Sequence, residues 1–424
     1  MLELSIIRAN PDAIKERLSI KNFKDIHLVD NIVAADEQRR KLQQQGDDLL
    51  NKQNILSKEI GALVKQGKNA EVAQAKADTV ALKEESQNIQ QQLADAETQL
   101  HDLLIQLPNL PHSSVPAGKM AEDNVEVKRH GQIPTLHAGA LPHWELTEKY
   151  DLMSLELGVK ITGAGFPLYK GKGARLQRAL IAFFLDEGNA AGYTEFIPPH
   201  LVNQDSAYAT GQLPDKEGQM YHVTADSLYL IPTAEVPLTN IYRDVIVKED
   251  ELPIKITGYT PCFRREAGSY GAHVRGLNRV HQFDKVEIVQ IAHPDHSYDI
   301  LENMKAHVEG LLQKLELPYR ILRLCGGDMS FTSALTFDFE VYSAAQEKWL
   351  EVSSVSNFET YQANRLKLRF RDNQTKKPRL AHTLNGSALA LARIVASLLE
   401  NHQTPEGIRI PKALQSYTGF DIIN

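Results

Sequence analysis

Cysteine is scarce in this 424-residue sequence, and long apolar stretches are missing. The two cysteines, Cys262 and Cys325, cannot form a disulfide framework, and their separation is not a zinc-ligand pattern. We expect two reduced, buried thiols. The longest charge-free stretches fall short of the ~18 apolar residues of a membrane span. The N-terminus has an early acid at Glu3 and no basic region, so it does not resemble a signal peptide. We expect a cytoplasmic protein with no membrane partner.

Aromatic residues and proline are absent from one long region. No aromatic residue lies between Phe23 and Trp144, and no proline lies between Pro11 and Pro108. Residues 30–107 are instead rich in Ala, Leu, Gln, Glu and Lys, which favour helix. Apolar residues recur there with coiled-coil spacing: Leu42, Leu49, Leu56 and Leu63, then Leu82, Ile89, Leu93, Ala96, Leu100 and Leu103.

A turn signal, Lys65–Asn69, separates the two halves of this region. The sequence therefore predicts two long helices folded into an antiparallel hairpin, an arm with a single buried seam. Leu and Ala fill such a seam, whereas bulky aromatic side chains do not fit it. From the pattern alone, a dimerisation coiled coil and two helices of a bundle remain open.

Net basic charge is also absent from the chain as a whole. The formal charge of −7 argues against a generic nucleic-acid coat protein. The charge is uneven, however. Residues 52–83 carry six lysines against three acids, a net charge of +3, whereas residues 84–102 carry five acids and no Lys or Arg. The basic end lies around the predicted turn, where it could contact phosphates, although helix surfaces are commonly charged.

After the arm, Pro108, Pro111 and Pro116 mark a linker, and aromatic residues return from Trp144 onward. Short β-branched runs then alternate with helical stretches, which indicates an α+β domain with an antiparallel sheet. We therefore expect two domains, residues 1–110 and 111–424. The predicted strands and helices are Leu228–Ile231, Lys255–Tyr259, Val286–Ile291, Ala174–Ala191 and Tyr298–Leu315.

Several common catalytic motifs are missing. There is no P-loop, no HExxH and no GxSxG, and the glycine-rich stretch Gly171–Arg175 is more typical of a helix start. Two arginine-containing segments stand out instead. Phe263–Glu266 followed by Arg275–Phe283 has a strand–loop–strand layout, and Asn385–Arg393 is predicted at the start of a helix. Arginine on a strand can bind phosphate with two hydrogen bonds, and a helix start with small residues favours anions.

These segments resemble the class II aminoacyl-tRNA synthetases. Phe263–Glu266 with Arg279–Phe283 resembles motif 2, Asn385–Arg393 resembles motif 3, and Gly192–Pro199 resembles motif 1, with Pro199 at the motif proline. One departure is Ala388, where the general motif has a second glycine; alanine is still small. The motifs would occupy about residues 175–202, 258–290 and 382–400.

Within that class, the resemblance is to bacterial-type seryl-tRNA synthetases. It rests on the N-terminal arm and on Pro232–Asn240, Glu351–Phe358 and His382–Ser387, and it covers essentially the whole chain in the family's order. The resemblance implies an antiparallel-sheet catalytic domain with helices, preceded by a long antiparallel coiled coil. It also implies a homodimer in which the arm of one subunit guides tRNA to the active site of the other.

The implied reaction joins L-serine to ATP as seryl-adenylate, releases pyrophosphate, and transfers serine to tRNA(Ser), and to tRNA(Sec) in organisms that have one. The attacking serine carboxylate is already ionised at pH 7, so no general base is needed. Catalysis is then mostly positioning and charge stabilisation. A site rich in Arg and Glu suits this chemistry.

The resemblance assigns roles around ATP. Arg264 would hold the α-phosphate and Arg393 the γ-phosphate. Glu266 would reach the adenine amino group, and Phe283 would stack on the adenine ring. Mg²⁺ would be held by Glu351 and Ser354, since hard oxygen ligands suit this ion. The remaining ATP-binding residues would be Arg265, Val280, Val352 and Ser353.

For serine, Glu235 would bind the ammonium group and Ser387 would lie near the side chain. The other serine-binding residues would be Thr233, Ala234, Arg264 and Glu287. The coiled coil would cross the long variable arm of the tRNA, and its expected tRNA-binding residues are Lys52, Lys58, Lys65, Lys68 and Lys76. Only 31 residues follow Arg393, too few for a C-terminal anticodon-binding domain.

Three rival functions stay open at the level of sequence. A class II paralogue could adenylate an amino acid for another acceptor, but the well-formed arm argues against it. A non-enzymatic scaffold would have lost motif arginines, yet Arg264, Arg279 and Arg393 are present. A zinc-dependent variant lacks an obvious Cys/His/Glu triad.

Overall fold

A computed structural model describes residues 1–267 and 275–424. Part of the predicted motif 2 range, residues 268–274, therefore lies outside the described residues. The chain divides into two compact units. Unit 1 consists of Met1–Ser19 and Phe23–Pro108, and unit 2 of Ile20–Asn22 and Asn109–Asn424. No helix among the described residues is long and apolar enough to cross a membrane.

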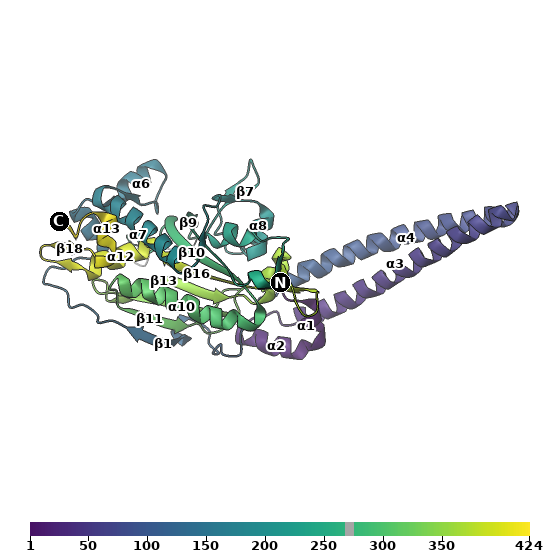
Figure 1. The fold of residues 1–424 in the computed structure, drawn as a ribbon, viewed down its shortest axis with the longest axis horizontal. Helices are drawn as coiled ribbons and strands as arrows, with labels where there is room; N and C mark the ends of the chain where they lie inside the picture. Colours follow the sequence, from purple (N-terminus) through teal and green to yellow (C-terminus); the bar gives the residue numbers. More distant parts are fainter. Residues whose placement is uncertain (268–274) are drawn as a thin grey trace. The chain divides into compact units, whose positions relative to one another are not determined.

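Unit 1 contains only helices, and its two long helices run side by side along their length (Figure 1). The turn between them spans residues 66–68, so the predicted hairpin is confirmed. Leu42, Leu49, Ala96 and Leu100 are buried along the seam, as the heptad spacing requires. The helices are α1 (Leu4–Ala9), α2 (Pro11–Ile20), α3 (Leu28–Lys65) and α4 (Asn69–Leu104).

Unit 2 is built on an eight-stranded sheet with the order β1-β11-β12-β13-β16-β10-β9-β4. All neighbours in it are antiparallel except β4 and β9, so the predicted antiparallel sheet is confirmed. Its strands are β1 (Val125–His130), β4 (Thr194–Glu195), β9 (Ile254–Phe263), β10 (Gln282–Ala292), β11 (Tyr319–Arg323), β12 (Leu335–Ser343), β13 (Lys348–Asn357) and β16 (His382–Ala390).

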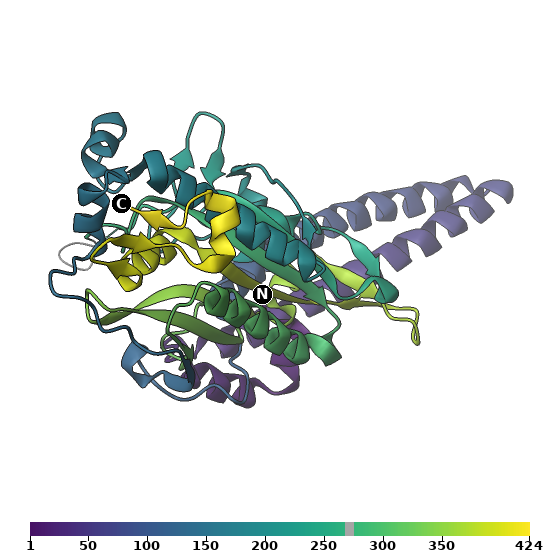
Figure 2. The ribbon, with the colours of Figure 1, turned by 60° about the vertical axis from the view of Figure 1, so that its left-hand side comes forward.

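The helices of unit 2 cover this sheet. The α7 helix packs on β9 and β10, α10 on β13 and β16, and α12 on β10, β12 and β13. In Figure 2 the green α10 lies against the sheet. The helices are α5 (His143–Lys149), α6 (Leu155–Ile161), α7 (Gly171–Ala190), α8 (Gln204–Thr210), α9 (Glu235–Asn240), α10 (Ser297–Lys314), α11 (Thr360–Leu366), α12 (Leu391–Asn401) and α13 (Lys412–Thr418), with 3₁₀ turns η1 (Ala121–Asp123), η2 (Glu249–Glu251) and η4 (Pro294–His296).

Smaller sheets complete the unit. They are β2 with β3, β5 with β6 and β7, β8 with β14 and β15, and β17 with β18 and β19. Their bounds are β2 (Met153–Ser154), β3 (Leu168–Tyr169), β5 (Leu201–Val202), β6 (His222–Val223), β7 (Leu228–Leu230), β8 (Ile246–Lys248), β14 (Arg369–Arg371), β15 (Pro378–Leu380), β17 (Gln403–Thr404), β18 (Gly407–Arg409) and β19 (Ile422–Ile423).

The segment Asn385–Arg393 differs from its prediction. We predicted it at the start of a helix, but residues up to Ala390 form strand β16 and the helix begins at Leu391. The strand lies between β10 and β13, and both neighbours pair with Asn385 and Gly386. Ladder hydrogen bonds on both sides hold these residues extended, and neither Asn nor Gly favours a helix. Motif 3 therefore presents a central strand followed by a helix.

Candidate active site

A pocket of about 590 Å³ lies in unit 2, lined by residues of β10, β12, β13 and β16 and by neighbouring segments, among them the residues that follow β9. Most of the residues predicted from the sequence line it. They are Thr233, Glu235, Arg264, Glu266, Val280, Phe283, Glu287, Glu351, Val352, Ser353, Ser354, Ser387 and Arg393. The sheet order brings these side chains together, because β16 stands between β13 and β10.

Two predicted residues do not line the pocket. Ala234 is fully buried next to the start of α9. The Arg265 side chain is exposed, and its backbone N–H donates to the Gln219 carbonyl oxygen.

Arg264 and Phe283 form one wall of the pocket. The Arg264 guanidinium carbon lies 5.2 Å from the centre of the Phe283 ring, and its Nε donates to the Pro232 carbonyl oxygen at 3.2 Å. These two contacts fix the arginine, whose remaining N–H groups can bind an anion. Nearby, Glu266 pairs with Arg279 at 2.7 Å. The carboxylate expected at the adenine amino group therefore has a cationic partner within the protein.

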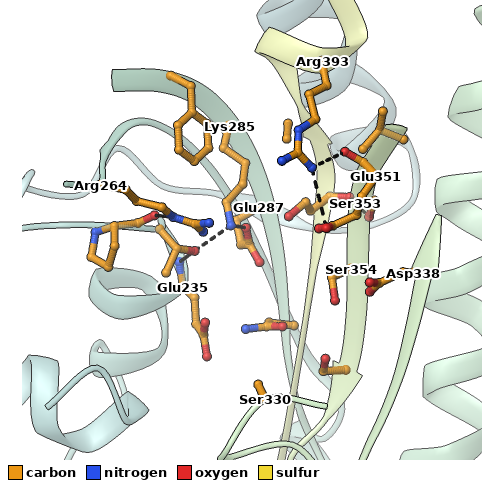
Figure 3. A pocket seen from close by; sticks show the side chains of 18 of the residues that line it. Glu235, Arg264, Lys285, Glu287, Ser330, Asp338, Glu351, Ser353, Ser354 and Arg393 are labelled. Atoms are coloured by element: carbon orange, nitrogen blue, oxygen red, sulfur yellow. Dashed lines mark hydrogen bonds and ion pairs between the residues drawn. The ribbon is translucent and has the colours of Figure 1, made fainter. Parts of the chain in front are cut away.

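Arg393, in the first turn of α12, forms the opposite wall. Its Nε donates to the Asn278 carbonyl oxygen at 3.0 Å, and Nη1 donates to the Glu351 carbonyl oxygen at 2.8 Å. The Glu351 carboxylate lies 3.6 Å from the same guanidinium. Figure 3 shows Arg393 and Glu351 on one side of the pocket, with Arg264, Lys285 and Glu287 on the other. Two arginines thus face one cavity from different elements.

A buried polar cluster occupies the part of the pocket near α9. Lys285 Nζ donates to Thr233 Oγ1 at 2.7 Å and lies 2.5 Å from Glu287 Oε2. Glu235 accepts a hydrogen bond from Gln362 Nε2 at 2.6 Å, and Gln362 in turn accepts from Thr383 Oγ1. The cluster holds two carboxylates and only one ammonium group. Its electrostatics therefore favour the binding of one more cation.

The pKa of Glu235 reflects this surplus of carboxylates. Burial is the largest cause and the neighbouring Glu287 carboxylate the second, and together they raise the pKa of Glu235 to about 7. The Gln362 hydrogen bond opposes this shift only in part. A ligand ammonium group beside Glu235 would favour its ionised form and lower its pKa.

Ser387 lies between the two halves of the pocket. It stands opposite Glu287 in the β10–β16 ladder, and its carbonyl oxygen accepts from Ser353 Oγ at 2.6 Å. Its side chain is 8% exposed. The position of Ser387 along the central strand β16 is therefore fixed, and its hydroxyl can hydrogen-bond to a small polar group of a ligand.

Oxygen ligands suitable for a divalent cation line the β13 side. Ser354 stands opposite Asp338 in the β12–β13 ladder, and their side chains are hydrogen-bonded. Asp338 Oδ1 is buried without a hydrogen-bond partner among the described residues. Burial, followed by the Glu351 charge, raises the pKa of Asp338. An unpartnered buried oxygen beside a carboxylate and a hydroxyl suits a hard cation such as Mg²⁺.

Sequence reasoning missed several residues of this pocket. Lys285 could have been found, because it precedes Glu287 by two positions on a strand and so shares its face. Asp338, and Gln362, which contacts Glu235, carried no comparable signal, since each is near its partners only after the sheet and α11 have formed. Asn385 lies in the segment Asn385–Arg393, two positions before Ser387 on the same strand, so it too could have been found.

Unit 1 presents its lysines to solvent. The five predicted tRNA-binding residues, Lys52, Lys58, Lys65, Lys68 and Lys76, are all exposed. Lys68 pairs with Glu71 at 3.2 Å. Both cysteines are buried, as expected, and burial raises the pKa of Cys262.

Two protein-family models match the chain. The first, described as the seryl-tRNA synthetase N-terminal domain, matches residues 1–111. The second, described as the tRNA synthetase class II core domain (G, H, P, S and T), matches residues 221–402.

Curated relatives and solved structures also match over nearly the full length. The serine–tRNA ligase of Salinibacter ruber is 50% identical over 99% of this chain and 98% of its own, and that of Hydrogenobaculum sp. is 47% identical over 98% and 99%. The crystal structure of seryl-tRNA synthetase from Pyrococcus horikoshii complexed with ATP is 33% identical, with a TM-score of 0.93 over 100% of this chain and 99% of that one. The cytoplasmic serine–tRNA ligase of Naegleria fowleri in complex with AMP is 26% identical, with a TM-score of 0.88 over the same shares.

Proposed function

The chain belongs to the seryl-tRNA synthetase family and is an ATP-dependent serine–tRNA ligase, and we propose that the pocket of unit 2 is where serine and ATP react. One observation carries this proposal: two arginines suited to bind phosphate, Arg264 and Arg393, line the same cavity as a buried carboxylate cluster. A paralogue that adenylates an amino acid for a different acceptor is not favoured, because the similarity to serine–tRNA ligases includes the arm.

ATP would lie between the two arginines. Arg264, held by Phe283 and the Pro232 carbonyl, faces the α-phosphate, where negative charge builds as the serine carboxylate attacks. Arg393 holds the γ-phosphate of the leaving pyrophosphate. The Phe283 ring stacks on adenine with Val280 beside it, and Glu266 accepts from the adenine amino group. Val352 and Ser353 complete the ATP-binding wall.

Serine would bind in the carboxylate cluster. Its ammonium group pairs with Glu235 and Glu287, and Thr233 offers a hydroxyl oxygen, so Lys285 must shift to make room. The serine hydroxyl meets Ser387. A buried site that hydrogen-bonds a substrate hydroxyl rejects the analogue without it by about 10⁴ or more, so alanine should be a poor substrate.

Mg²⁺ would be held by Glu351 and Ser354, with Asp338 beside them. Among the described residues there is no group of three His, Cys, Asp or Glu side chains arranged to hold a metal ion. One or two protein ligands are enough for Mg²⁺, because the ion usually keeps several waters and also binds substrate phosphates. When bound, the ion neutralises phosphate charge. The arginines still position ATP, and the serine carboxylate needs no base because it is ionised at pH 7.

We also propose that unit 1 is the tRNA-binding domain, that unit 2 is the catalytic domain, and that two chains form a homodimer. The dimer proposal is supported by Ile197, which follows edge strand β4 and is 89% exposed. The exposed lysines of α3 and α4 would bind tRNA(Ser), and tRNA(Sec) where it exists. Light scattering on the purified protein tests the dimer.

Shortening the arm tests whether unit 1 serves tRNA binding and unit 2 serves adenylation. Gln53 Nε2 donates to the Leu82 carbonyl oxygen at 2.9 Å, so these residues face each other and can be joined by a tight turn after residues 54–81 are excised. We expect serine-dependent ATP–pyrophosphate exchange to stay near wild type while serylation of tRNA(Ser) is lost, as for excision of all of residues 30–107. Normal serylation by the shortened protein would contradict the role of the arm.

A further inference from the structure

His143, the first residue of α5, is fully buried and lies outside the pocket lining. Both of its ring nitrogens are engaged. Nε2 accepts a hydrogen bond from the Leu277 backbone N–H at 2.8 Å, and Nδ1 lies 2.6 Å from Glu400 Oε1. Because Nε2 accepts, the proton must be on Nδ1, which donates to the carboxylate. The Leu277 amide therefore fixes which ring nitrogen accepts and which donates.

Glu400, on α12, is also fully buried. Its carboxylate accepts from the ring and the backbone N–H of His143, from Gln346 Nε2 at 2.8 Å, and from the Ser343 hydroxyl. None of the hydrogen bonds described for it comes from Lys or Arg. A buried carboxylate without a cation needs all of its donors, so these contacts are mutually dependent.

From Glu400 the hydrogen bonds reach the pocket along two routes. The first passes through His143 to Leu277, which lines the pocket. The preceding Gly276 has φ +66°, and a Cβ there would lie 2.2 Å from His143 Nε2, so the loop backbone packs directly on the imidazole. The position therefore requires glycine.

The second route runs through Gln346 and Asn278. Gln346 Oε1 accepts from Asn278 Nδ2 at 2.9 Å, and the Asn278 carbonyl oxygen accepts from Arg393 Nε at 3.0 Å. Three hydrogen-bonding steps thus connect the Glu400 carboxylate to the guanidinium proposed for the γ-phosphate. Among the described hydrogen bonds, none connects this network to Thr233, Glu235 or Glu287.

We propose that His143 and Glu400 are positioning residues for ATP. They hold residues 275–280, the described end of the motif 2 loop, and Arg393 in the arrangement that binds the nucleotide. This inference rests on the proposed role of Arg393. Since catalysis here is mostly positioning, a small displacement of the loop and the arginine should weaken ATP binding and slow adenylation, whereas serine binding should be nearly unchanged.

The substitution His143→Asn tests this selectively. The asparagine amide can still donate near the Nδ1 position toward Glu400, but it cannot reach the Leu277 amide. We expect the KM for ATP to rise at least tenfold and kcat to fall, up to the ~100-fold loss that follows a displacement of about 1 Å. The KM for serine should stay within twofold. Serine-dependent pyrophosphate exchange gives both constants, normalised by the burst of adenylate formation so that only folded sites count.

Gln403→Ala is the matched control. Gln403 is buried near the same end of α12, exchanges two hydrogen bonds with the backbone of Leu141, two residues before His143, and donates to the Glu400 backbone carbonyl, but none of its described hydrogen bonds goes to the Glu400 carboxylate or to residues 275–280. We expect it to lower the melting temperature without changing the ratio of the two KM values. If His143→Asn behaves in this same way, the positioning role is wrong.

A second substitution keeps the test decisive if His143→Asn does not fold. Gln346 is only partly buried, so Gln346→Ala removes the second route at less cost to folding. It should raise the KM for ATP about threefold or more and leave that for serine unchanged; an unchanged KM for ATP would overturn the second route. A wild-type protein without serine-dependent exchange would instead refute the proposed function.

Discussion

Lys285 Nζ lies 2.5 Å from Glu287 Oε2, and both side chains are more than nine-tenths buried. The lysine supplies the one positive charge among two carboxylates that line the proposed serine subsite. It neutralises Glu287 but leaves Glu235 with a pKa raised to about 7. The side chains of the protein therefore leave this site short of one cation, the charge that the serine ammonium group carries.

The first prediction concerns the pH dependence of serine binding. Serine ammonium pairs with ionised Glu235, and at pH 6 only about one tenth of a group with pKa about 7 is ionised. The KM for serine should therefore fall roughly tenfold between pH 6 and pH 8 in pyrophosphate exchange. Glu235→Gln should have a higher KM that no longer varies over this range, while Glu217→Gln, at the rim of the same pocket, should keep the wild-type profile. A flat wild-type profile would contradict the role of Glu235.

The same group has a consequence for stability. Between its unfolded pKa of 4.5 and its folded value of about 7, Glu235 binds more protons in the folded state. The free energy of unfolding should therefore fall as pH rises through this window, by on the order of 3 kcal/mol. Glu235→Gln removes this contribution, so the melting temperature of the ligand-free variant should decline less between pH 5 and pH 8 than that of wild type. Equal declines would argue against the raised pKa.

The second prediction concerns Arg264. Methionine has a similar length and no charge, so Arg264→Met should lower kcat/KM for pyrophosphate exchange by about 10²–10³, the usual effect of removing one donor to developing charge. Lysine should restore little, because it cannot form two parallel hydrogen bonds. The exposed Arg369, on β14, provides the control Arg369→Met, which should be close to wild type. Activity of Arg264→Met within twofold of wild type would exclude the phosphate role.

The third prediction concerns the metal. Glu351→Gln and Ser354→Ala should each raise the Mg²⁺ concentration for half-maximal exchange about tenfold, while the maximal rate is partly recovered at high Mg²⁺. Glu347→Gln, an exposed position on the same hairpin, is the matched control and should leave the requirement unchanged. If the Mg²⁺ requirement of both pocket variants equals that of Glu347→Gln, the assignment is wrong.

The fourth prediction concerns the lysines of unit 1. Replacing Lys52, Lys58, Lys65, Lys68 and Lys76 by glutamine should lower the affinity for tRNA(Ser) and reduce its salt dependence. Each phosphate contact contributes about 0.7–0.9 to the slope of log K against log[salt]. Pyrophosphate exchange should not change. The control replaces the exposed Lys367, Lys376 and Lys377 of unit 2 by glutamine. An equal decrease of the salt slope in this control would show that the effect comes from the overall charge of the protein and not from the arm.

Helix spacing and turn residues were enough to predict the arm, because its contacts are local and repeat every seven residues. Two strands of the eight-stranded sheet were predicted from β-branched runs, Lys255–Tyr259 in β9 and Val286–Ile291 in β10. The segment before Arg393 was predicted wrongly, because pairing with β10 and β13 holds Asn385 and Gly386 extended, and such pairing is invisible in local sequence.

The site could be predicted residue by residue only through motif resemblance. Other residues within a motif range, such as Lys285, could have been predicted from strand periodicity. Gln362 and His143 were not, since each contacts residues more than a hundred positions away in the chain, Glu235 and Leu277 respectively.

The strand order of the sheet sets a limit on how this enzyme can change. The residues proposed for the metal are on β13, Ser387 is on β16, and Glu287 and Phe283 are on β10, so the proposed binding groups lie on adjacent strands. Their spacing is the interstrand distance of about 4.8 Å, which main-chain hydrogen bonding fixes and loop insertions cannot alter. Loops such as residues 372–377 can therefore lengthen or diverge freely, whereas a two-residue slip of β16 would carry Ser387 away from Glu287 and uncouple the two substrates.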